Sequence, residues 1–288
     1  MSGSLPRLLP LALLLAGLSG CNVFPLSPNP PLRAEKETVP GLPDKHLVRV
    51  GQFVFFSDFE IARGHALFKE LGALREQVTS ELKLPSASQA IFVYVFEDKD
   101  HFERFMQSKY PDFPRRRAFF VAQPRRLGGT EDLLVYTFWG DRVTQDLRHE
   151  LTHALLHSVL KDVPLWLDEG LAEFFEVPTG WKGINYQHLD LLLRGPEAPA
   201  KLEIDRLEQL IKVNQMAPGE YREAWAWTHW MLRGNAAARK TLLAYIQELR
   251  TNPNPGPLGP RLARVVPDMS TAAQRHMVEM DRTRKPAK

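Results

Sequence analysis

One segment near the middle of the chain carries side chains that could bind a metal ion. Its sequence is LRHELTHALLH, residues 147–157, in which histidine recurs at every fourth position. In a helix, His149 and His153 lie one turn apart on the same face, so two imidazole nitrogens can reach one ion. Glu150 lies beside them and could act as a general base without binding the metal. This HExxH pattern is typical of catalytic zinc sites.

A catalytic zinc ion needs a third protein ligand and an open position, and the next helical segment offers the ligand. Residues 162–176 read DVPLWLDEGLAEFFE, in which Glu169 and Glu173 are four positions apart and share a helical face. The short link KDVP makes the two segments antiparallel neighbours. We therefore expect Glu169 to complete a His/His/Glu site. Glu173, one turn further on, is expected to accept a hydrogen bond from the second nitrogen of His149, as carboxylates behind metal ligands do.

Other polar residues of this region have plainer interpretations. His157 extends the histidine row, but it lies two turns from His149 and lacks the glycine and the spacing of a third-histidine pattern, so we do not expect it to bind metal. Asp168 falls in the first turn of its helix, where a negative charge is favourable. The arginines at 115–117 and 125–126 are expected to form a solvated loop rather than a phosphate or lipid-headgroup site.

The two motifs HELTH and WLDEGLAEFF together resemble those of the gluzincin metallopeptidases. In that family HExxH lies on one helix, and a glutamate on the next helix is the third ligand, often within W-L-x-E-G. The chain is similar in particular to the peptidase-MA-like bacterial proteins, over residues 46–250, with the specific part in 145–176. The resemblance implies a zincin-like catalytic domain, zinc held by the three ligands named above, and Glu150 as the general base of peptide-bond hydrolysis.

The same resemblance implies a hydrogen-bond donor for the oxyanion, a tyrosine or a histidine further along the chain. The segment EYREAWAWTHWML, residues 220–232, is similar to the helix that follows in that family, and Tyr221 stands near its start. We expect Tyr221 to be the donor, with His229 as the second candidate and simple packing of the tyrosine as the alternative. The stretch 105–145 contains no G-x-M-E-N element of the kind found in the aminopeptidases of this superfamily, which favours an endopeptidase.

Hydrophobic periodicity indicates the elements that must position these residues. In the first half of the chain, apolar runs predict four strands, at 53–56, 91–96, 118–122 and 133–139. One helix is expected after the first strand, where Ser57 and Glu60 have the spacing of a capping box, and a short helix is expected near 100–108. The run 133–139, which comes directly before the histidine-bearing segment, could form the cleft edge that pairs with an extended substrate.

From Asp141, which could cap the histidine-bearing helix, the apolar positions follow helical spacing. Helices are predicted at 142–160, 165–176, 203–213, 220–233 and 236–250. The segment 251–288 opens with a proline-rich stretch and is predicted to be a C-terminal tail with a weak helix. The sequence thus predicts an α+β fold, with a small mixed α/β lobe and a short sheet at 46–140 and a mainly helical lobe at 141–250.

The first residues are typical of an export signal. Residues 1–20 carry one positive charge and an apolar run too short to cross a bilayer. They end in Leu-Ser-Gly before Cys21, which resembles a bacterial lipobox. We expect lipid attachment at Cys21 and a tether at 21–45, with an ordinary signal peptide as the alternative. Because Cys21 is the only cysteine, a metal in the mature protein must bind through His, Asp or Glu.

Size and charge set the remaining limits. The chain has 288 residues, a length that suits one medium domain or two lobes. Its net charge of +3 is nearly balanced and gives no reason to expect a nucleic-acid partner. The sequence therefore predicts a zinc peptidase that acts on peptides or proteins. Lipid is expected to hold it at the bacterial cell envelope, on the periplasmic or outer-surface face. A lipid-anchored zinc protein with a structural or non-peptidase role is the main alternative, although a structural site has no use for an unligated base such as Glu150. A hydrolase of non-peptide amides is a third.

Overall fold

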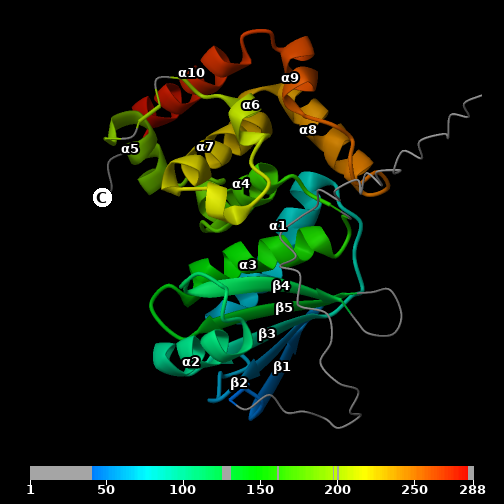
Figure 1. Ribbon diagram of the computed structural model, residues 1–288, viewed down its shortest axis with the longest axis vertical. Coiled ribbons are helices and arrows are strands. Elements are labelled where there is room, and N and C mark those ends of the chain that lie inside the picture. Colours follow the sequence, from blue (N-terminus) through cyan, green and yellow to red (C-terminus); the bar gives the residue numbers. More distant parts are fainter. Residues whose placement is uncertain (1–40, 125–130, 161, 197, 200, 285–288) are drawn as a thin grey trace, which may run out of the picture.

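The computed structural model describes residues 41–124, 131–160, 162–196, 198–199 and 201–284, and it has an α+β architecture. A five-stranded sheet with its helices occupies the N-terminal half, and a helical region follows (Figure 1). Cys21 and residues 1–40, which include the predicted signal peptide and most of the predicted tether, lie outside the described residues. Among the described helices, none has the length and apolar character needed to cross a membrane.

The sheet has the strand order β1-β2-β3-β5-β4. Its strands are β1 (His46–Val50), β2 (Phe53–Ser57), β3 (Ile91–Phe96), β4 (Ala118–Pro124) and β5 (Glu131–Phe138). β2, β3 and β5 are parallel, whereas the two outer strands run antiparallel to their neighbours. The four predicted strands are confirmed. β1 is additional, and it is a short edge strand whose alternate residues are exposed, so it lacks the apolar run of a buried strand.

The strand at 133–139 does not form a cleft edge. β5 lies between β3 and β4, so its backbone is paired on both sides. The prediction that this run pairs with an extended substrate is therefore wrong. The edge strand on this side of the sheet is β4, which pairs with no second strand in the described part of the chain. It packs against the helix that carries the histidines.

Alternation along the strands divides the apolar side chains between the two faces of the sheet. On one face, Val93 of β3 and Val135 of β5 join the main core with helix α1 (Ala66–Leu82). On the other face, Tyr136 joins an aromatic cluster with helix α2 (Lys99–Lys109). Helices therefore cover the sheet on both sides, and this packing fixes the position of β4 at the edge of the sheet.

Two predicted helix starts are wrong. Ser57 is the last residue of β2, and its hydroxyl donates to the carbonyl oxygen of Phe59, whereas α1 begins at Ala66 with His65 as its N-cap. The helix after the sheet is preceded by Arg142 rather than by a capping Asp141. In both places a residue of a capping type is present, but the helix begins at a later residue. The capping residue type alone therefore does not determine where the helix starts.

The helical region contains α3 (Val143–His157), α4 (Leu165–Phe175), α5 (Tyr186–Arg194), α6 (Ile204–Leu207), α7 (Pro218–His229), α8 (Ala236–Leu249), α9 (Gly259–Val265) and α10 (Met269–Arg282). α3, α4, α7 and α8 confirm four predicted helices. The fifth, 203–213, is confirmed only in part, since α6 is a single turn. A π-helical turn, Trp230–Gly234, extends α7, and α5 is an additional helix.

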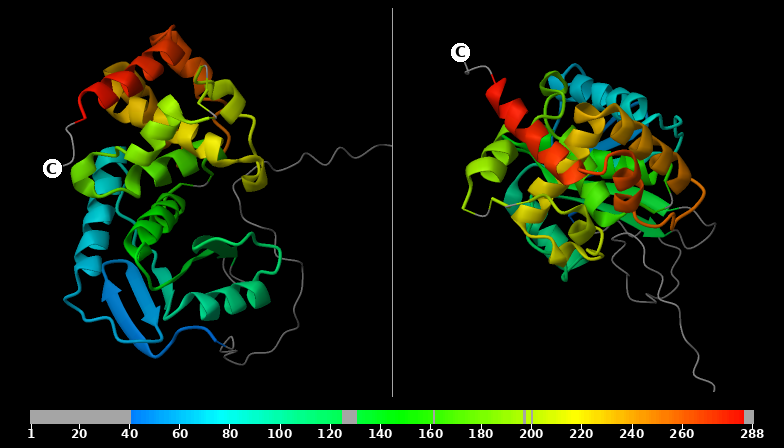
Figure 2. Two further views of the ribbon diagram at one scale, coloured as in Figure 1. Left: turned by 90° about the vertical axis from the view of Figure 1, so that its left-hand side faces the viewer. Right: turned by 90° about the horizontal axis from the view of Figure 1, so that it is seen from above.

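Residues 251–288 were predicted as a tail with a weak helix. The helix is confirmed by α10, but the described part of the segment is packed on the molecule and is not a free tail. α9 and α10 pack on the helical region, and Leu262, Ala273 and Met277 are buried in the main core. α10 contacts α5 and α7 and lies across the outer side of the helical region (Figure 2). The proline-rich stretch is therefore an irregular connection between the packed helices α8 and α9.

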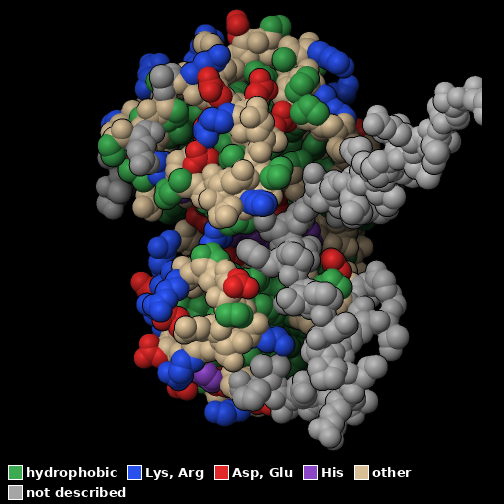
Figure 3. All heavy atoms as spheres, viewed as in Figure 1, with side chains coloured by type: hydrophobic (Ala, Val, Ile, Leu, Met, Phe, Trp, Pro, Cys, Tyr) green, Lys and Arg blue, Asp and Glu red, His purple; other side chains and the backbone are tan. Residues whose placement is uncertain are grey.

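The two halves of the molecule share one hydrophobic core. The main cluster contains residues of β3, α1 and α3 as well as of α8 and α10. Arg148 of α3, whose side chain is 1% exposed, adds a polar link: it donates to Glu70 of α1 at 2.7 Å and to the carbonyl oxygen of Phe175 at 2.9 Å. Outside this shared core the surface is hollowed between the halves, and histidine side chains lie in the hollow (Figure 3).

Candidate metal centre

Two packed helices, α3 and α4, carry the predicted ligands. α3 turns Leu147, Leu151 and Ala154 into the core, so the HExxH positions between them lie towards the cleft. α4 begins directly after Pro164, which cannot continue a preceding helix and suits a helix start. The short connection makes α4 cross back over α3 and brings Glu169 opposite the histidines.

The three predicted ligands come together. Nε2 of His149 lies 3.4 Å from Oε2 of Glu169, and Nε2 of His153 lies 3.6 Å from the same oxygen. One donor atom from each residue lies within 4.8 Å of the other two. At this spacing all three atoms can bind one ion at the usual zinc distances of about 2.0–2.2 Å. His149, His153 and Glu169 therefore form a group that could hold a metal ion, as their spacing in the sequence predicts.

The carboxylate of Glu169 fits a cation. Its side chain is 6% exposed, and Oε2 makes no hydrogen bond among the described residues. Burial raises the pKa of Glu169, but the two neighbouring histidines outweigh burial and lower the pKa to about 2. A buried, ionised oxygen without a hydrogen-bond donor is unusual in a folded protein, and a bound metal ion would satisfy it.

The carboxylate behind His149 belongs to Glu176 and not to Glu173. Nδ1 of His149 lies 3.0 Å from Oε2 of Glu176, whereas Oε2 of Glu173 lies 2.7 Å from Nε2 of His188 on α5. The expected hydrogen bond from His149 to Glu173 is therefore wrong. Glu173 and Glu176 follow Glu169 at positions that share one helical face, so helical spacing alone does not select between them.

The neighbours of Glu176 hold its carboxylate in place. Gln145 of α3 and Asn185 before α5 donate to Oε1 of Glu176 at 2.7 Å and 3.0 Å, which leaves Oε2 for His149. Although burial raises the pKa of Glu176, the hydrogen bonds from His149 and Gln145 lower it below its usual value. With Nδ1 donating to this carboxylate, His149 presents Nε2 to the ligand group.

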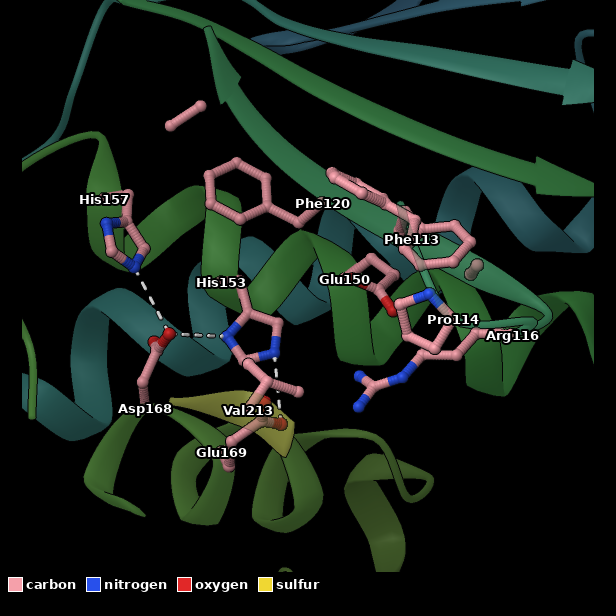
Figure 4. Close-up of a pocket in the computed structure, with 13 residues that line it drawn as sticks. Phe113, Pro114, Arg116, Phe120, Glu150, His153, His157, Asp168, Glu169 and Val213 are labelled. Carbon is pink, nitrogen blue, oxygen red and sulfur yellow. Dashed lines mark hydrogen bonds and ion pairs between the residues drawn. The ribbon is translucent and has the colours of Figure 1, made fainter. Parts of the chain in front are cut away.

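Asp168 is the carboxylate beside the second nitrogen of His153, a contact that the sequence did not predict. Oδ2 of Asp168 lies 3.0 Å from Nδ1 of His153 and 3.2 Å from Nε2 of His157 (Figure 4). The two histidines oppose the effect of burial and hold the pKa of Asp168 well below its usual range. Asp168 was expected only to favour the start of its helix. The contact depends on how α4 crosses α3, and no spacing within one helix indicates it.

Glu150 lines the cavity next to the ligand group without belonging to it (Figure 4). Burial raises the pKa of its carboxyl group, and the nearby His149 and His153 oppose this effect only in part. A carboxyl group with a raised pKa is better suited to accept a proton near neutral pH than an ordinary one. Glu150 lies beside the ligand group, and its role as a general base stays a prediction.

Of the two predicted oxyanion donors, Tyr221 faces the cleft. It lines the same cavity as His149 and Glu150. Burial raises the pKa of Tyr221 to about 12, so the phenol keeps its proton. His229 is instead buried, and its Nδ1 lies 3.0 Å from Nε2 of His276 on α10. The structure therefore favours Tyr221 over His229 as a group that could meet a ligand.

The arginines at 115–117 are only partly the solvated loop that was expected. Nη2 of Arg116 donates to Oη of Tyr221 at 2.8 Å, and Arg117 pairs with Asp146 at 2.9 Å. Both contacts reach helices of the second half of the chain, so this loop closes one end of the cleft. The arginines at 125–126 lie outside the described residues.

A glycine next to Glu169 allows α7 to approach α4. A Cβ atom at Gly170 would lie 2.5 Å from the hydroxyl oxygen of Thr228 and 2.6 Å from the carbonyl oxygen of Ala224. Only glycine avoids these contacts at this helix separation. The glycine of the W-L-x-E-G stretch therefore has a packing reason, and the close approach places Tyr221 of α7 beside the ligand group.

Two adjoining cavities flank the ligand group. The first, of about 70 Å³, reaches His153 and Glu169 and has an apolar wall that includes Phe113 and Phe120. The second, of about 610 Å³, reaches His149 and is lined largely by polar side chains. Arg116, Ala118 and Glu150 line both cavities, so the two form a continuous cleft with the predicted base at the junction.

The chain matches one family model in its second half. Residues 144–255 match the family described as "Protein of unknown function (DUF1570)". The matched segment includes the ligand group, Glu150 and Tyr221, and it covers less than half of the chain. A search of the curated proteins found no match.

Proposed function

We propose that this protein is a zinc metallopeptidase of the gluzincin type, an endopeptidase that acts on peptides or proteins. The observation that carries the proposal is the convergence of His149, His153 and Glu169 beside the unligated carboxylate of Glu150 in one cleft. Two imidazoles and one carboxylate are a common ligand set of catalytic zinc. The proposal also includes attachment to the bacterial cell envelope through lipid on Cys21, for which the sequence is the support.

The residues of the cleft have separate roles in this proposal. Zinc would polarise the scissile carbonyl group and lower the pKa of the attacking water. Glu150 takes a proton from the water as its oxygen bonds to the carbonyl carbon, and passes the proton to the leaving nitrogen as the C–N bond breaks. The products are a carboxylate and an amine. Glu176 and Asp168 keep the imidazoles of the two ligand histidines oriented.

The strand β4 supports a polypeptide as the substrate. Ala118, Phe119 and Phe120 of β4 line the apolar cavity, and β4 is an edge strand. An extended peptide could add to such an edge through backbone hydrogen bonds, with its side chains in the adjoining cavities. The cleft continues on both sides of Glu150, which leaves room for residues before and after the cleaved bond. This favours an endopeptidase.

The alternative, a structural zinc protein, is less well supported. Structural zinc sites are closed by four protein ligands, whereas here three ligand residues border a cavity. Glu150 would have no task in a closed site.

Metal analysis and protease assays test the proposal together. The purified protein is expected to contain one zinc ion per chain, as in mononuclear catalytic sites, and to cleave a denatured protein such as casein. Removal of zinc by a chelator should abolish cleavage, and added zinc should restore it. Glu150→Gln should keep the metal and the fold but lose about 10²–10⁴-fold in rate, because proton transfer is lost while ligation is unchanged. Equal rates for Glu150→Gln and the wild type would contradict the peptidase mechanism.

A further inference from the structure

Arg116 and Tyr221 form a hydrogen-bonded pair across one end of the cleft. Arg116 lies in the loop before β4, and Tyr221 lies in the first turn of α7. Nη2 of Arg116 is 2.8 Å from Oη of Tyr221, and the guanidinium carbon is 5.9 Å from the centre of the tyrosine ring. The pair therefore joins the two halves of the molecule beside the ligand group.

The chemistry of the two groups fixes the direction of this hydrogen bond. A guanidinium group carries only donors and stays protonated, whereas a phenol can donate and accept. Oη of Tyr221 must therefore be the acceptor, and its own hydrogen remains to donate to another group. A positive charge at the phenol oxygen also makes the O–H group a stronger donor. The pair thus presents one polarised O–H donor.

The surroundings direct this donor into the cleft. Tyr221 lines the cavity that contains His149 and Glu150, and Arg116 lines both cavities at their junction. The guanidinium group of Arg116 is turned towards His153 and Glu169 in the close-up of the site (Figure 4). Within the described parts of the chain Arg116 forms no ion pair with a carboxylate. Its hydrogen-bonding partner among these residues is Tyr221, so its charge acts on the phenol.

We propose that Arg116 is a positioning residue, which orients and polarises Tyr221 so that its hydroxyl group donates to the carbonyl oxygen of the substrate. This inference rests on the proposed function, since the negative charge on that oxygen develops during hydrolysis. When the water adds, the carbonyl π electrons move to the oxygen, and a donor already aimed at this atom stabilises the charge. Without Arg116 the phenol loses both its orientation and its polarisation.

A double-mutant cycle on the zinc-loaded protein tests the coupling. Tyr221→Phe should lower kcat by about 10²–10³-fold, and Arg116→Gln should lower it by about 10–100-fold, with KM and zinc content little changed. The double variant should be no slower than Tyr221→Phe, because Arg116 acts through the tyrosine. Arg116→Lys should restore part of the rate. Arg115→Gln removes the neighbouring exposed charge and should behave as the wild type.

Binding of a peptide phosphonate, measured by calorimetry, gives a readout that does not need turnover. Its tetrahedral anion imitates the charged carbonyl oxygen, so its affinity should fall in Arg116→Gln and in Tyr221→Phe, and no further in the double variant. The positioning role would be overturned if the losses of the two single variants multiplied in the double variant. A change in KM alone would also overturn it.

The outcomes separate the two proposals. If Glu150→Gln abolishes cleavage while Arg116→Gln leaves kcat and phosphonate affinity unchanged, only the role of Arg116 fails. If the wild type cleaves nothing but phosphonate binding shows the expected coupling, the peptidase proposal fails and the pair stands as an anion-binding donor. If the zinc-loaded wild type does not bind the phosphonate, both fail.

Discussion

Replacing Gly170 by alanine tests whether the approach of α7 to α4 determines the metal-binding geometry. The added Cβ atom would lie 2.6 Å from the carbonyl oxygen of Ala224 and 2.5 Å from the hydroxyl of Thr228. Unstrained contacts between heavy atoms lie at about 3.5 Å. The Ala224 oxygen belongs to the backbone, so it cannot move aside by a change of rotamer. The two helices must therefore separate by about 1 Å to relieve the overlap.

This displacement has two consequences of different size. Overpacking costs about 1–3 kcal/mol, but alanine is favoured over glycine inside a helix by about 1 kcal/mol. The free energy of unfolding should therefore fall by at most about 2 kcal/mol. Glu169 is the residue next to Gly170, and metal–ligand distances tolerate only about 0.2 Å. We expect zinc affinity to fall by at least about 10-fold, which is out of proportion to the loss of stability.

The assay combines urea unfolding of the metal-free protein with zinc titration against a competing chelator. Gly180→Ala is the matched control, because nothing lies within 4 Å of a Cβ atom at that position. The control should match the wild type in both measurements. Wild-type zinc affinity in a folded Gly170→Ala protein would refute the link between helix approach and ligand geometry.

Three further predictions concern separate residues. Glu176→Gln should weaken zinc binding by about 10–100-fold, whereas Glu173→Gln should change it little, and a reversed result in zinc titrations would contradict the observed contacts. Cys21→Ser should abolish lipid labelling of the protein in cells, and equal labelling would exclude an anchor there. Burial, His276 and Arg233 lower the pKa of His229 to about 3, from 6.5. The unfolded chain therefore takes up the proton first, so stability present above pH 6.5 is lost as pH falls towards 3. This loss should amount to about 2 kcal/mol between pH 7 and 5, and an unchanged pH dependence of urea unfolding in His229→Gln would contradict it.

The sequence predicts well what depends on local spacing. The strands at Phe53, Ile91, Ala118 and Leu133 follow from short apolar runs, and the long helices follow from apolar positions three and four apart. The ligand group follows the same rule, because an i, i+4 pair on each of two antiparallel helices fixes which side chains can meet. Local geometry is common to all helices, so it can be read without knowing the rest of the fold.

What the sequence did not predict depends on contacts between distant segments. Asp168 reaches His153 only because α4 crosses α3 at a particular angle, and Glu176 meets His149 in place of Glu173 for the same reason. Arg116 meets a residue more than a hundred positions later. The order of β4 and β5 in the sheet also depends on contacts between distant segments. The cleft edge was therefore assigned to residues 133–139 in place of β4.

The shared core limits how the cleft can move. Since the main hydrophobic cluster passes without interruption from the sheet through α3 to α8 and α10, opening the two halves as rigid jaws would expose apolar side chains to water. It would also separate the buried guanidinium of Arg148 from Glu70. Packed cores resist such continuous deformation. The width of the entrance is therefore set during folding. If the proposed peptidase function is correct, its substrate is expected to be an exposed loop or an unfolded segment, which is thin enough to enter, and not a compact domain.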